Sequence, residues 1–141
     1  MEIRSGRSED VDAVVDLWRR EGGPTSLPGG RSEAEALLRR DPDALLIARA
    51  DEELVGTLII GWDGWRCHLY RLVVEPEWRR SGVASELVAE ARTRATTFGA
   101  RKIDAMVNFE NEAALAFWEG RHFEQDPRDG RWSLRLSSSD D

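Results

Sequence analysis

The sequence has few of the residues that cross-link a chain or anchor it in a membrane. Cys67 is the only cysteine among 141 residues, which excludes an intramolecular disulfide and any zinc site built from several cysteines. No apolar run approaches the roughly 18 residues that suggest a membrane-spanning helix. The first residues, Met1–Ser5, lack the basic stretch and apolar core of a signal peptide. We therefore expect a cytoplasmic protein without a membrane partner.

Positive charge is also scarce. The chain has 20 Lys and Arg residues against 27 Asp and Glu, so its formal net charge is −7. Nucleic acids and anionic membranes attract clustered positive charge, and we expect neither as a partner. Surplus acid suits a cationic substrate, but it more often serves solubility.

Length and composition predict one domain with its own core. Hydrophobic residues make up 40% of the chain and charged residues 33%, an ordinary composition for a globular protein. A chain of this size buries roughly two-thirds of its unfolded surface, so it needs no disulfide or metal to fold. We expect a single domain over residues 1–136 and a polar tail at 137–141.

Periodicity and turn residues predict strands and helices in a mixed order. Strands are expected at residues 2–5, 44–50, 54–62, 65–74 and 102–107, with turns at Asp51-Glu52 and Asp63-Gly64. Helices are expected from an N-cap at Ser8 to Gly22, and then at 32–40, 82–98 and after Asn111. A last hairpin is expected over 123–136, with Trp132, Leu134 and Leu136 pointing inward. This order predicts an α/β (α+β) fold with a mixed, mostly antiparallel central sheet and helices on both faces.

The segment from Leu72 to Ser85 carries the chemistry. It is a strand that ends at Pro76, a turn with two arginines, and a helix that opens on small residues. A helix N-terminus has free N–H groups and a partial positive charge, which together bind phosphate. Gly82 and Ala84 leave room for a ligand to approach the backbone, and arginine suits phosphate oxygens.

Neither of two better-known phosphate motifs fits this turn. A P-loop needs Lys and then Ser or Thr after its last glycine, and a dinucleotide fingerprint needs three spaced glycines. Here Gly82 is the turn's one glycine, and Val83 follows it. The residues alone leave two interpretations open, a phosphate seat or a plain helix start with solvated arginines.

Two motifs resemble those of the GNAT superfamily of N-acyltransferases. Arg79-x-x-Gly82-x-Ala84, preceded by Leu72-x-Val74-x-Pro76, is similar to the signature Arg/Gln-x-x-Gly-x-Gly/Ala and its leading strand. The segment Asn111-x-x-Ala114-x-x-Phe117-Trp118 resembles the second motif of this family, usually Asn-x-x-Ala-x-x-Phe-Tyr followed by Gly-Phe. The predicted order of elements also resembles the GNAT-like acyl-CoA N-acyltransferase fold.

The resemblance implies that acetyl-CoA is the acyl donor and that an amine attacks its thioester directly. Backbone groups of the strand would pair with the pantetheine arm, and those of the turn would hold the pyrophosphate, while Asn111 would touch the pantetheine or its phosphate side. The implied cofactor-binding residues are Leu72, Val73, Val74, Arg79, Arg80, Ser81, Gly82, Val83, Ala84, Ser85 and Asn111. A backbone N–H near Val74 would polarise the carbonyl.

The catalytic positions implied by the resemblance are Tyr70 and Trp118. Trp118 stands where the family commonly has the tyrosine that protonates the leaving thiolate, and indole is no usable acid near neutral pH. Tyr70 lies two residues before Leu72, where some members carry a carboxylate; the alternative is a packed aromatic residue. His68 shares its strand face with Tyr70, and His122 replaces the usual glycine of the Gly-Phe pair. Cys67, His68 and His122 match no metal-site spacing, so no metal is expected.

The expected partner is therefore an amine acceptor, either a small molecule or a protein amine. A homodimer is also expected, because Trp132, Leu134 and Leu136 would lie on an apolar edge strand that something must cover. The alternative to an enzyme is an acyl-CoA-binding sensor or interaction module that lost proton transfer at Trp118.

Overall fold

The computed structural model describes residues 1–23, 29–108 and 110–136. They divide into two units, residues 1–105 and 106–136, and each is described by itself. The expected tail at 137–141 lies outside the described residues, and the single domain over 1–136 stays a prediction. Within these ranges, no helix is long and apolar enough to cross a membrane.

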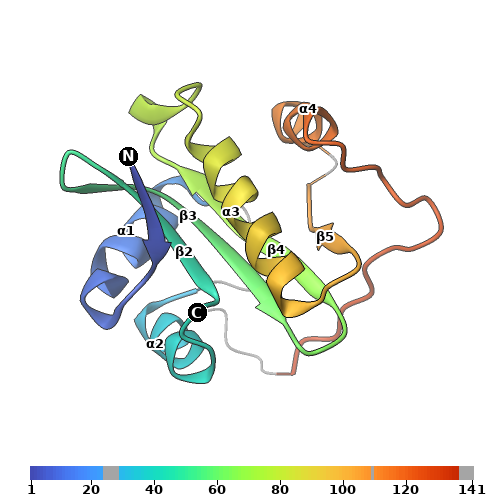
Figure 1. The fold of residues 1–141 in the computed structure, drawn as a ribbon, viewed down its shortest axis with the longest axis horizontal. Coiled ribbons are helices and arrows are strands. Elements are labelled where there is room, and N and C mark those ends of the chain that lie inside the picture. The colour runs from blue at the N-terminus through green and yellow to red at the C-terminus, as the bar shows by residue number, and fades with distance from the viewer. Residues whose placement is uncertain (24–28, 109, 137–141) are drawn as a thin grey trace. The chain divides into compact units, whose positions relative to one another are not determined.

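The first unit contains a five-stranded sheet with strand order β1-β2-β3-β4-β5 (Figure 1). The strands are β1 Glu2–Ser5, β2 Leu45–Ala50, β3 Glu53–Trp62, β4 Cys67–Val74 and β5 Ile103–Ala105. The first four pair antiparallel to one another, and β5 runs parallel to β4. The mixed, mostly antiparallel sheet is therefore confirmed. Asp51 and Glu52 join β2 to β3 with positive φ at both positions, as a tight two-residue hairpin turn requires.

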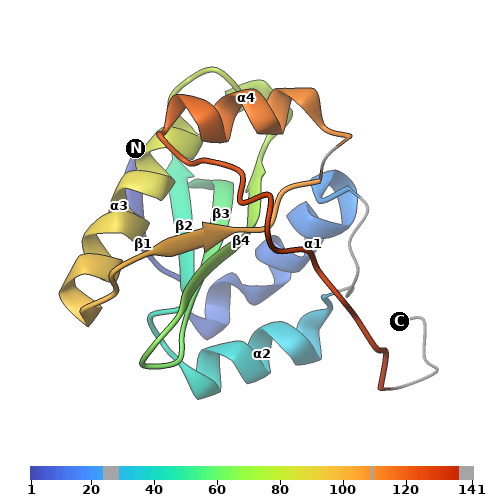
Figure 2. The same cartoon turned by 90° about the vertical axis from the view of Figure 1, so that its right-hand side faces the viewer.

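Helices cover both faces of this sheet, as expected. Figure 2 shows α3 on one side and α1 and α2 on the other. The helices are α1 Val11–Glu21, α2 Arg31–Arg40 and α3 Val83–Phe98. On the α1 side, Val14, Leu17 and Trp18 pack with Ile47 and Ile59 of the sheet. On α3 the buried stripe is Val83, Leu87, Val88, Ala91 and Ala95.

The expected N-cap at Ser8 is wrong. Residues Ser8–Asp10 form a 3₁₀ turn, and α1 begins only at Val11. Asp10 is buried, and its carboxylate accepts hydrogen bonds from the Arg7 N–H at 2.8 Å and from Arg4 Nη1 at 2.9 Å. The carboxylate of Asp10, two residues beyond the predicted cap, thus closes the 3₁₀ turn before α1 and pairs with Arg4 of β1.

The second unit contains α4, Glu112–Gly120. Asn111 is its N-cap, as predicted, and the Asn111 Oδ1 accepts the Ala114 N–H at 3.0 Å. The hairpin expected over 123–136 is wrong, because these residues form no strand. Pro127 removes one N–H, and Glu124, Gln125 and Asp126 give the apolar arm no apolar partners; a two-stranded hairpin alone is marginal in water.

Trp132, Leu134 and Leu136 do not point inward in this structure. They are between 85% and 96% exposed. The expected homodimer rested on an edge strand that these residues do not form. It stays a prediction, and the three exposed apolar side chains are its remaining support.

Candidate functional site

The strand β4 lies between β3 and β5, and its edge on the β5 side is paired for only part of its length. The pairs with β5 are Cys67 with Ile103, His68 with Asp104 and Leu69 with Ala105. Beyond Leu69, no strand in the described part of the chain pairs with this edge, while β3 still pairs with the other edge as far as Val74. The half of β4 that contains Leu72, Val73 and Val74 therefore offers one edge of its backbone to a ligand.

A β-bulge lies at the start of this half-paired stretch. Ile59 lies opposite Tyr70, but Thr57 lies opposite Val73, so Arg71 and Leu72 share the single residue Leu58 as their counterpart. Arg71 has φ +57, a left-handed conformation that is uncommon for a residue with a side chain. Such a bulge bends the strand and changes which groups point to each edge.

The hydrogen-bond pattern shows that Val74 faces the free edge. The Glu75 N–H donates to the Val55 carbonyl at 2.9 Å, which makes Val55 and Glu75 a hydrogen-bonded pair. In an antiparallel ladder such pairs alternate with pairs that do not exchange bonds. The N–H and C=O of Val74, one residue earlier, therefore point away from β3 and toward the unpaired edge.

The N-terminus of α3 lies beside the end of β4. Gly56 of β3, opposite Val74, packs so tightly on α3 that a Cβ there would be 2.8 Å from Val83 Cγ1. Gly82 is the N-cap, with φ +85 and no side-chain cap, and a Cβ at Gly82 would meet no atom within 4 Å. The Glu86 N–H makes the bond to the Gly82 carbonyl, so the N–H groups of the first turn have no acceptor within the helix.

Ion pairs hold the turn before α3 against the end of α1. Arg79 Nη2 lies 3.3 Å from Glu21 Oε1, and Arg20 Nη2 lies 2.6 Å from Glu75 Oε1. The Arg79 guanidinium thus already has a carboxylate partner, and its backbone is better placed than its side chain to receive an anion. Arg80, Ser81 and Gly82 are exposed, and Arg80 also has a positive φ.

Tyr70 and His68 lie on the α1 side of the sheet. Tyr70 lies opposite Ile59, whose side chain is in the core beneath α1. The Tyr70 side chain is 42% exposed, and partial burial raises the pKa of its phenol. His68 Nδ1 lies 4.0 Å from Asp104 Oδ2. At neutral pH Tyr70 therefore holds its proton, which makes it unsuited to act as a base.

Trp118 has a structural role in the second unit. The Phe123 N–H donates to the Trp118 carbonyl at 3.1 Å, and the His122 N–H donates to the Glu119 carbonyl at 3.0 Å. These bonds form a Schellman motif, which commonly adds an apolar contact between the two ends. Here the Trp118 and Phe123 rings make that contact, with centroids 4.8 Å apart. His122 occupies the left-handed position of the motif, with φ +71.

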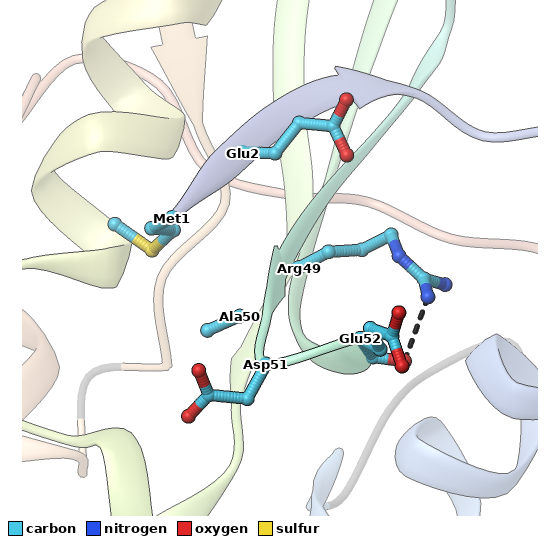
Figure 3. A pocket seen from close by; sticks show the side chains of 6 residues that line it. All are labelled: Met1, Glu2, Arg49, Ala50, Asp51 and Glu52. Atoms are coloured by element: carbon cyan, nitrogen blue, oxygen red, sulfur yellow. Dashed lines mark hydrogen bonds between the residues drawn. The ribbon is translucent and has the colours of Figure 1, made fainter.

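A shallow pocket lies elsewhere on the first unit, at the β1–β2 edge (Figure 3). Glu2, Asp51 and Glu52 line it, and Arg49 donates to the Glu52 carbonyl at 2.7 Å. Its carboxylates would repel a phosphate, and β2 and β3 separate it from β4. Among the described residues, no group of three His, Cys, Asp or Glu side chains is placed to hold a metal ion.

Comparison with known proteins agrees with this geometry. Residues 11–123 match the model of the acetyltransferase (GNAT) family. An acetyltransferase of Pectobacterium atrosepticum is 34% identical over 124 residues, which cover 88% of each chain. The chain therefore belongs to the GNAT acetyltransferase family.

Solved structures support the fold. Ribosomal-protein-alanine N-acetyltransferase from Brucella melitensis superposes with a TM-score of 0.75 at 19% identity, over 88% of this chain and 85% of that one. AAC(6')-Iy, in complex with the bisubstrate analog CoA-S-monomethyl-acetylneamine, superposes with a TM-score of 0.77 at 22% identity, over 96% and 98%.

The position of His122 generates a prediction about stability. A side chain in the left-handed region costs about 1–2 kcal/mol, and glycine returns about 0.5–1 kcal/mol of that as extra chain entropy when unfolded. We expect His122→Gly to raise the free energy of unfolding by about 0.5–1 kcal/mol, measured by urea denaturation. Gly99, at the same position after α3 with φ +94, provides the reverse control: Gly99→His should lower it by a similar amount. A loss on His122→Gly would contradict the assignment of strain to this residue.

Proposed function

We propose that this protein transfers an acetyl group from acetyl-CoA to a primary amine, on a small molecule or a protein. The supporting observation is that the pairing of β4 with β5 ends at Leu69, which leaves one edge of β4 open near the uncapped N-terminus of α3. A donor with a long amide-bearing arm and a pyrophosphate matches both features: the arm adds to the free edge of β4, and the anion meets the first turn of α3.

The implied cofactor-binding residues then contact different parts of acetyl-CoA. Val74, next to Leu72 and Val73, presents its C=O to the arm and its N–H to the thioester carbonyl at the end of the arm. The backbone from Arg79 to Ser85 surrounds the pyrophosphate, with Gly82 leaving the approach open. Asn111, whose side-chain oxygen caps α4, keeps the role that the family motif implies, a contact with the donor.

The reaction needs little from side chains. The neutral amine attacks the thioester carbonyl and forms the C–N bond, and the C–S bond breaks. The nitrogen releases one proton to solvent, and the CoA thiolate takes one proton from solvent. The Val74 N–H, directed to the free edge, polarises the carbonyl where the negative charge develops. The bound CoA bisubstrate analog of AAC(6')-Iy supports this choice of donor for the fold.

Donor binding at α3 is tested by Gly82→Glu against a matched control. The change puts bulk and negative charge where the pyrophosphate would lie. Acetyl-CoA should raise the thermal midpoint of the wild type, since a ligand at 100 times its Kd adds about 2.7 kcal/mol to the free energy of unfolding. We expect Gly82→Glu to lose most of this shift.

Gly99→Glu is the control, because Gly99 also has a positive φ and open space around it, at the opposite end of α3. Both variants should melt lower than the wild type without ligand, and only Gly99→Glu should keep the acetyl-CoA shift. Equal shifts in the two variants would place the donor elsewhere.

The proton for the leaving thiolate is the second point to test. Trp118 cannot supply it, and burial raises the pKa of Tyr70, which weakens it as an acid. A thiolate is a good leaving group that solvent can protonate. We therefore propose that neither side chain limits turnover.

The prediction is that Tyr70→Phe and Trp118→Tyr keep kcat within about threefold of the wild type between about pH 6 and 9, per folded molecule. General acid catalysis typically raises the rate ~10²–10⁴-fold, so the loss of a general acid would be visible in kcat. A loss of tenfold or more in Tyr70→Phe would show that Tyr70 is the acid. A gain in Trp118→Tyr would show that protonation limits the rate, despite a stability cost of about 1–3 kcal/mol from the smaller ring.

A non-catalytic acyl-CoA-binding module is the second candidate, favoured by Trp118 in place of the tyrosine. Thiol release from acetyl-CoA with a panel of amines separates the two. Turnover on any amine supports the enzyme. An acetyl-CoA shift in the thermal midpoint without thiol release on any amine supports the module.

A further inference from the structure

Thr57, in the middle of β3, is a fully buried polar residue. Its side chain is 0% exposed. The Thr57 Oγ1 accepts the Trp18 Nε1–H of α1 at 2.9 Å and donates to the Arg71 carbonyl at 3.0 Å. One hydroxyl therefore joins α1 to the backbone of β4 at the bulge.

The Arg71 carbonyl belongs to the residue that the bulge adds. The extra residue of a bulge falls outside the ladder, so its polar groups need other partners. Thr57 lies opposite Val73, two residues further along, on the same side of the sheet as α1. The Thr57 hydroxyl, a side-chain group of β3, donates to the Arg71 carbonyl.

The bulge decides which backbone groups reach the free edge. The Ile60 N–H donates to Ala44, away from β4, so Ile59 with Tyr70 is a hydrogen-bonded pair. Without the extra residue this alternation would continue to Thr57 with Leu72 and Val55 with Val74, and Val74 would point at β3. With it, Val73 and Glu75 point at β3, and Val74 points outward.

The Arg71 side chain also contacts α1, through Trp18. Its guanidinium carbon lies 5.0 Å from the centroid of the Trp18 ring. The same indole thus contacts the Arg71 side chain with its face and Thr57 with its N–H. Arg71 is therefore contacted by side chains of both α1 and β3.

We propose that Thr57 is a positioning residue for acyl transfer. Its hydroxyl keeps the β4 bulge in place and so directs the Val74 N–H and C=O at the acetyl-CoA arm. The proposal rests on the proposed function, and Thr57 itself touches neither donor nor acceptor.

The test compares Thr57→Val, Thr57→Ser and Ile47→Ala. Valine keeps the shape and removes the hydroxyl, and serine keeps the hydroxyl. Ile47, opposite Thr57 on β2 and equally buried, controls for a loss of core packing without a loss of hydrogen bonds. The readouts are the KM for acetyl-CoA and the midpoint shift that acetyl-CoA causes, both at a temperature where each variant is folded.

We expect Thr57→Val to raise the KM for acetyl-CoA at least tenfold and to lose most of the midpoint shift. Thr57→Ser and Ile47→Ala should stay within threefold of the wild type, although Ile47→Ala melts lower. If Thr57→Val does not fold, Thr57→Cys replaces it, because a thiol is a weak donor of similar size. The KM of Thr57→Cys for acetyl-CoA should then lie above that of Thr57→Ser and below ten times that of the wild type.

A Thr57→Val or Thr57→Cys protein with the wild-type KM and shift would overturn the positioning role. So would an Ile47→Ala protein with the same tenfold rise, since the effect would then follow stability alone. A wild type without any acetyl-CoA shift would instead refute the proposed function.

Discussion

Beyond Leu69, and within the described part of the chain, β4 pairs with a strand on one side only. The proposed acetyl-CoA site depends on how this half-paired strand is held. A strand paired on one side has ladder bonds along one edge only, so contacts from the two faces of the sheet hold this half of β4 as well. Thr57 and Trp18 hold the bulge from the α1 side, and Gly56 lets Val83 of α3 approach β3 opposite Val74. The strand edge and the helix N-terminus therefore meet because of close packing around a residue without a side chain.

This arrangement also explains how an acidic chain can receive an anionic donor. The net charge of −7 opposes phosphate at long range, but salt screens that repulsion beyond about 8–10 Å. At contact, the helix dipole and the free N–H groups of the first turn of α3 dominate. Arg79 is engaged by Glu21, so the site relies on backbone groups, which carry no charge that a change of pH could remove.

The local parts of this account were predictable from the sequence. The turn from Pro76 to Gly82 and the cap at Asn111 depend on residues close together in the chain, and the four antiparallel strands follow from alternation and from two short turns. The bulge was not predictable, because a hydroxyl at position 57 and an indole at position 18 meet β4 only in the folded sheet. Leu72-Val73-Val74 looks like any buried strand.

Two errors have the same origin. The alternation of Trp132, Leu134 and Leu136 predicts a strand, but a strand needs a partner, and residues 123–127 offer none. Ser8 resembles an N-cap, but it is Asp10 of the same turn that contacts Arg4 of β1, a contact that the N-cap pattern does not show. Trp118 is the reverse case: the family motif identifies the position, and only the Schellman motif with Phe123 shows that the residue there closes a helix.

The most direct test of the proposed acetyl-CoA site is amide hydrogen exchange by NMR with and without acetyl-CoA. Acetyl-CoA should slow exchange at Val74 and at the first-turn amides of α3, Val83 and Ala84, while the amide of Gly64, exposed in the turn before β4, is unchanged. Slower exchange at other sites, with Val74 and Val83 unaffected at saturating acetyl-CoA, would contradict a donor bound along β4 and at the N-terminus of α3.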